Sequence, residues 1–184
     1  MIIRYLLCIV ICTIIWIING RYIIQAVREH FSGEFYMHIG LGIFFALLGI
    51  ELTVGIYWLH FNISWLKIIG WVLYIPSAYL VIVSHIALTH KGKSGTSYLD
   101  TTTLVDTGIY STIRQPMTLG MTIWSIALIL VFQSIPSIIL GICSSFCFWM
   151  SARKEVEYNI KKFGENYNKY IKRVPMWNIF KRIR

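Results

Sequence analysis

Long apolar runs, separated by short polar turns, occupy the first half of the chain. They cover about 2–27, 35–61 and 65–89, and the first is weakened by polar residues at 19–21. A helix needs about 20 predominantly apolar residues to cross the hydrocarbon core of a bilayer. The pattern therefore predicts three membrane-spanning helices in this half of the chain.

Two further apolar runs form a pair. One begins at Pro116 and ends near Phe132, and the other follows a short turn at 133–136 and ends near Met150. Proline is favoured in the first turn of a helix, because its missing N–H would have had no partner there. Because the turn is so short, the two helices are expected to form an antiparallel hairpin over 116–150.

The pattern changes after Met150. Apolar side chains now recur at helical spacing with lysines between them, which is typical of an amphipathic helix on a membrane surface. They are Val156, Ile160, Phe163, Tyr167, Tyr170 and Val174. Gly164 is expected to interrupt this helical segment, and Pro175 to end it.

Composition places the whole chain in one class. Hydrophobic residues make up 57% of it and charged residues only 14%, whereas a soluble domain carries about 25% charged residues. We therefore expect one all-α integral membrane domain over 1–184, with about five transmembrane helices and an amphipathic C-terminal segment. Its parts are three spans at 1–89, a cytoplasmic loop at 90–115, the hairpin at 116–150 and a basic catalytic tail at 151–184.

Positive charge gathers at the C-terminal end. The net charge is +9, and residues 151–184 hold ten of the seventeen Lys and Arg. A basic tail is compatible with nucleic-acid binding, but Lys and Arg also mark the cytoplasmic side and meet anionic lipid headgroups. We favour membrane lipids as the partner and expect no nucleic acid. The same rule predicts that the loop at 90–114 and the tail face the cytoplasm, in a multi-pass membrane protein.

Several polar residues inside the apolar runs have two readings. Glu51 lies within a predicted span, where a carboxylate marks either a functional site or a structural hydrogen bond to another helix. Cys8 with Cys12, and Cys143 with Cys147, have i,i+4 spacing but no His or acidic residue at ligand distance. We therefore expect these cysteines to pack as small hydrophobes and to hold no metal.

The polar stretch 101–120 stands out because it lies between strongly apolar segments. It contains the sequence LVDTGIYSTIRQPM, and the tail contains Glu155 followed by FGxxYxxY and Val174-Pro175. These two motifs, in this order and separated by a helical hairpin, resemble those of the isoprenylcysteine carboxyl methyltransferases and related phospholipid methyltransferases. The resemblance covers about 101–175.

The resemblance implies an enzyme that binds S-adenosyl-L-methionine at the cytoplasmic membrane face and methylates a lipophilic small molecule or a lipid-linked substrate, with a carboxylate as the favoured acceptor. It implies catalytic positions at Arg114 and Gln115 and a substrate contact near Arg153. The implied cofactor positions are Thr102, Thr103, Leu104, Val105, Gly108, Tyr110, Gln115, Pro116, Thr118 and Glu155.

The chain departs from the family motif at several of these positions. Gln115 stands where the family has His, Thr118 where it has Tyr, and Ser151 where the prenylcysteine enzymes have a substrate-binding Arg. Two other functions stay open from the sequence: a membrane reductase that uses NADPH, and a non-enzymatic membrane protein with a degenerate pocket. A similar helical layout supports either, because a fold does not determine function.

Overall fold

The computed structural model describes residues 2–92 and 101–177. These residues form six α-helices and two short 3-10 turns, with no strand among them. The helices are α1 (Ile2–Arg28), α2 (Ser32–Thr53), α3 (Ser64–Lys91), α4 (Pro116–Phe132), α5 (Ile135–Phe163) and α6 (Glu165–Arg173), and the turns are η1 (Gly55–Tyr57) and η2 (Gly108–Ser111). The all-helical membrane-protein prediction is confirmed.

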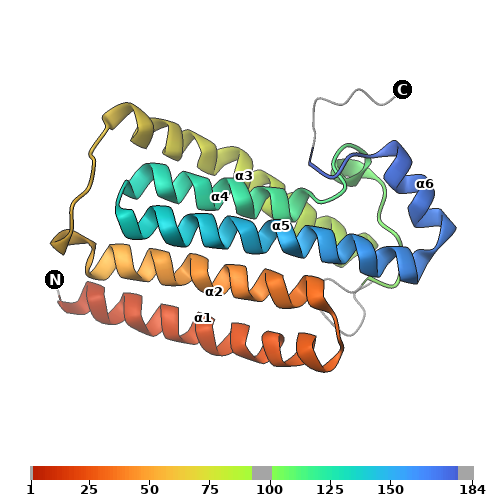
Figure 1. Cartoon of the computed structure of the whole chain (residues 1–184), viewed down its shortest axis with the longest axis horizontal. Helices are drawn as coiled ribbons and strands as arrows, with labels where there is room; N and C mark the ends of the chain where they lie inside the picture. Colours follow the sequence, from red (N-terminus) through yellow and green to blue (C-terminus); the bar gives the residue numbers. More distant parts are fainter. Residues whose placement is uncertain (1, 93–100, 178–184) are drawn as a thin grey trace.

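The five long helices pack side by side in the order α1, α2, α5, α4, α3 (Figure 1). The helices α1, α2, α3 and α5 are long and apolar enough to cross a membrane, and α4 is a shorter apolar helix. The N-terminus lies at one end of the bundle, whereas η2 and α6 lie together at the other end (Figure 1). The two ends of the bundle are therefore different surfaces, and only one of them carries the motif segments.

Small residues bring the central helices into close contact. Gly40 of α2 packs directly on the Phe148 ring of α5, and the Ser144 hydroxyl donates a hydrogen bond to the Gly40 carbonyl oxygen at 3.0 Å. Gly120 of α4 lies against the backbone of α3 at Ser77. Such contacts drive helix association in membranes, where lipid is as apolar as the side chains. Large apolar side chains on α1 and α3 instead face outward, where a bilayer would surround them.

Polar bonds close the end of the bundle that is remote from α6. The Gln133 side chain bonds both the N–H and the carbonyl oxygen of Ile63. The Ser134 hydroxyl caps α5 and donates to the carboxylate of Glu51, to which Trp58 also donates at 3.4 Å. These contacts fit the structural reading of Glu51. Helix α2 ends at Thr53, earlier than the sequence predicts, because the chain turns through η1 into this bonded loop.

Helix α5 continues through the predicted boundary at 150 and ends only at Phe163. Between Gly141 and Gly164 the helix contains no glycine or proline. The backbone therefore has no reason to stop where the side-chain pattern changes from apolar to amphipathic. Gly164, with a φ of 56°, ends the helix and turns the chain into α6. The second helix of the hairpin and the start of the tail are therefore one continuous element. Within the described residues, no group of His, Cys, Asp and Glu is arranged to hold a metal ion.

Candidate active site

Backbone hydrogen bonds join the two motif segments, although some sixty residues separate them. The N–H of Arg114 donates to the carbonyl oxygen of Pro175 at 3.0 Å, and the N–H of Gln115 donates to that of Met176 at 3.2 Å. The Arg114 guanidinium also donates to the Val174 carbonyl oxygen at 3.0 Å. The C-terminal segment is thereby fixed against the entrance of α4.

Side chains of α6 strengthen this junction. The Tyr170 phenol donates to the carbonyl oxygen of Tyr110 at 2.6 Å, and Arg173 forms an ion pair with Asp106 at 2.8 Å. On the inner face of α6, Tyr167 is buried with Tyr170 in a cluster that Leu104 and Phe163 cover. The amphipathic helix therefore packs on the loop at 101–115 with its apolar face.

An inner cavity lies where the two motif segments meet α5. Its walls include six of the residues that the sequence singles out: Leu104, Val105, Tyr110, Arg114, Gln115 and Glu155. The Gln115 amide donates to the Glu155 carboxylate, and Asn159 donates to it from the next helical turn at 3.5 Å. The cavity is small, about 20 Å³. Two amides thus hold a carboxylate beside the aromatic rings of Tyr110 and Tyr167.

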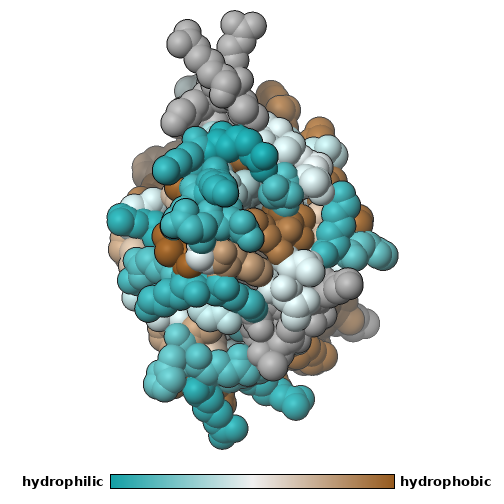
Figure 2. Space-filling view, turned by 90° about the vertical axis from the view of Figure 1, so that its right-hand side faces the viewer, coloured by the Kyte–Doolittle hydropathy of each residue, from teal (hydrophilic) through white to brown (hydrophobic). Residues whose placement is uncertain are grey.

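A larger outer cavity of about 490 Å³ adjoins the inner one and shares Leu104 and Phe163 with it. Thr102, Thr103 and Asp106 line it from the loop, and α6 supplies the opposite wall. Its size lies within the range of about 300–1,000 Å³ that is usual for small-molecule sites. Figure 2 looks onto this end of the molecule, where hydrophilic surface surrounds a smaller apolar area near the middle.

Burial keeps the tyrosines of the site in their neutral form. Burial, together with the nearby Glu155 carboxylate, raises the pKa of Tyr167 from 10.0 to about 12. Burial also raises the pKa of Tyr170. Both phenols therefore keep their protons at neutral pH and remain hydrogen-bond donors.

The remaining predicted residues do not line either cavity. Pro116 and Thr118 are buried in the first turn of α4, where the Thr118 hydroxyl donates to the Gln115 carbonyl oxygen and accepts from the Trp177 indole. Gly108 is exposed and opens η2 with a φ of 66°, a conformation that favours glycine. Arg153 is exposed, and its guanidinium lies over the Trp149 ring at 5.0 Å.

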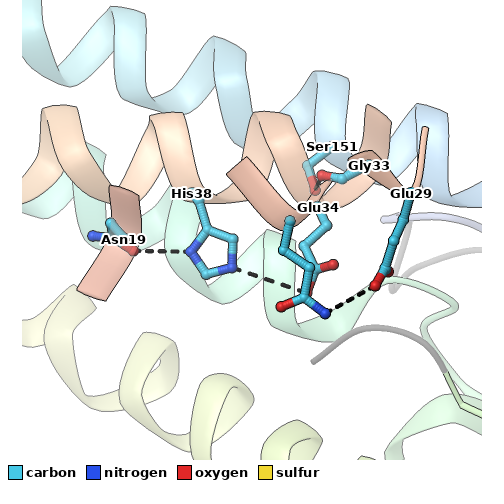
Figure 3. A network of polar contacts seen from close by, with 7 residues as sticks. Asn19, Glu29, Gly33, Glu34, His38 and Ser151 are labelled. Carbon is cyan, nitrogen blue, oxygen red and sulfur yellow. Dashed lines mark hydrogen bonds and ion pairs between the residues drawn. The ribbon is translucent and has the colours of Figure 1, made fainter. Parts of the chain in front are cut away.

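Some polar neighbours of the site were not singled out from the sequence. Asn159 lies four residues after Glu155, a helical spacing at which side chains are neighbours. Its contact with Glu155 could therefore have been predicted from the sequence. His38 and Glu34 of α2 gave no such signal, because their relation to the motif segments depends on how α2 packs on α5. The Ser151 hydroxyl donates to the Gly33 carbonyl oxygen at 2.7 Å (Figure 3) and brings the first turn of α2 beside Glu155.

The fold is that of a multi-helix membrane protein, and two adjoining cavities lie at one end of its bundle. The sequence model of the phospholipid methyltransferase family matches residues 65–166, which is more than half of the chain. The chain therefore belongs to the phospholipid methyltransferase family.

One characterised relative extends the comparison. The chain is 29% identical to the protein-S-isoprenylcysteine O-methyltransferase of Xenopus laevis over 119 residues, which is 62% of this chain and 41% of that protein. The match thus covers less than half of the relative's length. No solved structure matches the chain significantly.

Proposed function

We propose that this protein transfers a methyl group from S-adenosyl-L-methionine to a lipophilic or lipid-linked acceptor at the cytoplasmic face of a membrane. The observation that carries the proposal is the meeting of Gln115 and Glu155, from two distant motifs, in one cavity at the end of the helix bundle. Family membership supplies the type of reaction.

The residues of the site fit this cofactor. S-adenosyl-L-methionine brings a positive sulfonium, from which the methyl group leaves, and a positive ammonium. The half-buried carboxylate of Glu155 offers a counter-charge, and Tyr110 and Tyr167 offer aromatic faces beside it. The outer cavity adds Thr102, Thr103 and Asp106 as partners for the polar parts of the ligand.

The protein itself has mainly to bind the cofactor, align its methyl group with the acceptor and exclude water. Gln115 and Asn159 hold the Glu155 carboxylate in one orientation. Arg114 does not reach out as a free cation, because its guanidinium is bonded to carbonyl oxygens of the tail; we assign it a positioning role. The bonds between α6 and the loop keep the two walls of the cavity together, and such alignment is a large part of catalysis.

The acceptor is expected to come from the bilayer. Apolar side chains surround the helices, and the basic end of the bundle carries the site. A carboxylate acceptor, as favoured from the sequence, would call for a cation near Ser151 or Arg153. Ser151 is neutral and bonded to Gly33, and Arg153 lies outside both cavities. These positions give a carboxylate no special support over a neutral nucleophile.

Ligand-induced stabilisation tests the proposal. The melting temperature of the purified full chain should rise with S-adenosyl-L-methionine, since a ligand that binds only the native state stabilises it. A membrane extract should gain label from the methyl-labelled cofactor in the presence of the protein. A rise with NADPH instead would indicate a reductase, and no rise with either cofactor would indicate a non-enzymatic protein.

A further inference from the structure

The loop between α2 and α3, at 54–63, closes the end of the bundle that is remote from α6 (Figure 1). It lies on the turn between α4 and α5. The N–H of Phe61 donates to the carbonyl oxygen of Gln133 at 3.0 Å, and His60 pairs with Ser134 in an antiparallel bridge. The loop therefore joins the far ends of α2 and α3 to the hairpin of α4 and α5.

The imidazole of His60 lies between two main-chain carbonyl oxygens that belong to different elements. Nδ1 lies 2.6 Å from the carbonyl oxygen of Phe132, the last residue of α4, and Nε2 lies 2.8 Å from that of Gly55, the first residue of η1. A carbonyl oxygen only accepts hydrogen bonds, and a neutral imidazole has only one N–H donor. Both contacts are hydrogen bonds only when both ring nitrogens carry a proton. The arrangement is therefore that of a positively charged imidazolium.

The surroundings of the ring favour this charge. Phe132 ends α4, where the last carbonyl groups lack partners within the helix and the helix dipole is negative. Glu51 of α2 adds a negative charge and Lys67 of α3 an opposing positive one, whereas the turn at 132–137 has no ionisable side chain. The hydrogen bonds to Phe132 and Gly55, with a smaller effect of Glu51, raise the pKa of His60 above its usual 6.5.

Loss of one proton breaks this arrangement. His60 lies outside the membrane-spanning helices and is half-buried, so its charge can follow the pH of the adjoining solution. A neutral ring would turn one nitrogen lone pair toward a carbonyl oxygen, and two acceptors at this distance repel each other. Either the bond to the end of α4 or the bond to η1 is then lost.

We propose that His60 is a pH-dependent clamp, which in its protonated form fastens the loop at 54–63 to the end of α4. The inference is independent of the proposed methyltransferase function. Because the pKa of His60 is higher in the folded protein than in the unfolded chain, its stabilising effect is complete below about pH 6.5 and is lost as the pH rises through the folded-state pKa. The loop is held at acidic pH and released at alkaline pH.

Nitrogen NMR of the full chain in lipid nanodiscs, with isotope-labelled histidine, tests the charge of the ring. The signals of His60 are those absent from the His60 variants. Both ring nitrogens should be protonated at about pH 6.5, and the titration midpoint should lie above that value. Glu51→Gln, which keeps an acceptor for the Ser134 hydroxyl, should lower the midpoint, and Lys67→Gln should raise it. A midpoint at or below about 6.5 would overturn the inference.

Hydrogen exchange of the amides of Phe61 and Ile63 tests the clamp, because both N–H groups are bonded to Gln133. Protection is taken relative to the intrinsic exchange rate at the same pH. In the wild type it should fall about ten-fold between about pH 5 and about pH 9, as expected for loss of a charge-assisted hydrogen bond. The control is His90→Gln, on an exposed histidine at the C-terminal end of α3, which should behave as the wild type.

Two substitutions of His60 separate its charge from its bulk. His60→Gln is neutral at every pH, so protection should be low at both ends of the range. His60→Arg keeps a cation with several N–H donors, so its protection should stay higher than that of the Gln variant at alkaline pH.

Two results would contradict the clamp: protection in the wild type that does not change with pH, or a change that persists in full in His60→Gln. The binding of S-adenosyl-L-methionine is a separate measurement. Its failure would contradict the proposed function and leave the result for His60 as it stands.

Discussion

The phenol of Tyr170 donates a 2.6 Å hydrogen bond to the main-chain carbonyl oxygen of Tyr110. One residue belongs to α6 and the other to η2, so the bond joins the two walls of the candidate cofactor site. Both side chains are buried, at 3% and 7% exposed. The carbonyl oxygen of Tyr110 has little access to water. Removing its hydrogen-bond donor would therefore lower the stability of the folded state.

Tyr170→Phe should therefore loosen the site without unfolding the membrane bundle. Loss of this bond should lower the free energy of unfolding of the α6 region by about 1 kcal/mol and weaken the binding of S-adenosyl-L-methionine. Hydrogen exchange of the α6 amides and calorimetric titration measure the two effects. Tyr57→Phe is the control, because Tyr57 is 81% exposed at the other end of the bundle. Unchanged exchange in α6 would contradict the role given to this bond.

Glu155 is expected to contribute to cofactor affinity through its charge. Glu155→Gln keeps the shape of the side chain, and the loss of a charge-assisted hydrogen bond should weaken binding roughly ten-fold or more. Glu157→Gln is the matched control: Glu157 lies two residues away, is largely exposed and pairs with Lys154. Equal dissociation constants for the two variants would remove Glu155 from the site.

Gln115 is expected to position the cofactor and not to act as a base. Gln115→Ala should weaken binding, because the Glu155 carboxylate loses a donor. Gln115→His should retain binding and change turnover by less than about ten-fold. A hundred-fold gain in the His variant, following a titration between about pH 6 and 7, would show that the native site lacks a base at this position.

Alkaline pH should release α6 from the loop. The folded state raises the pKa of Tyr167 from 10.0 to about 12, so its contribution to stability is complete below about pH 10 and is lost as the pH rises toward 12. Circular dichroism and tyrosinate absorbance should change together over this interval. Tyr167→Phe should move the transition to higher pH, and an unchanged transition would show that another group controls it.

The orientation of the bundle is open to a direct measurement. Reporter fusions after Asn62 and after Ser134 should read outside, and a fusion after Arg184 should read inside, because the basic loop and tail mark the cytoplasmic side. A cytoplasmic signal at Ser134 would reverse the orientation and remove the proposed site from the cytoplasmic face.

The sequence predicted the helices well because membrane spans depend on local composition. The start of α4 at Pro116 and its end at Phe132 follow from a helix-starting proline and a polar turn. The end of α2 was misplaced, because Thr53 is followed by a loop whose bonds to Gln133 and Ser134 are made by distant residues. Local pattern carries no information about such partners.

The candidate site also combines residues that local motifs indicate with residues that only tertiary packing brings together. The motif resemblance singled out Gln115 and Glu155 as cofactor positions, and the structure places both in the wall of one cavity. It gave no signal for Glu34, which lies outside both motifs and comes near Glu155 only through the packing of α2 against α5. Arg153 was placed in the site by its nearness in sequence to Ser151, but a helix turns neighbouring residues to different faces, and Arg153 points to Trp149.

Because α5 is one continuous helix, its length determines where Glu155 lies relative to the membrane surface. Twenty residues of one helix, from Pro136 to Glu155, correspond to about 30 Å, the thickness of a hydrocarbon core. The cap at Ser134 anchors this rod near the far surface, and Gly164 is its first break. The distance from Ser134 to Glu155 therefore matches one bilayer thickness. In a thinner bilayer α5 must tilt, and Glu155 then shifts sideways relative to the lipids from which we expect the acceptor to come.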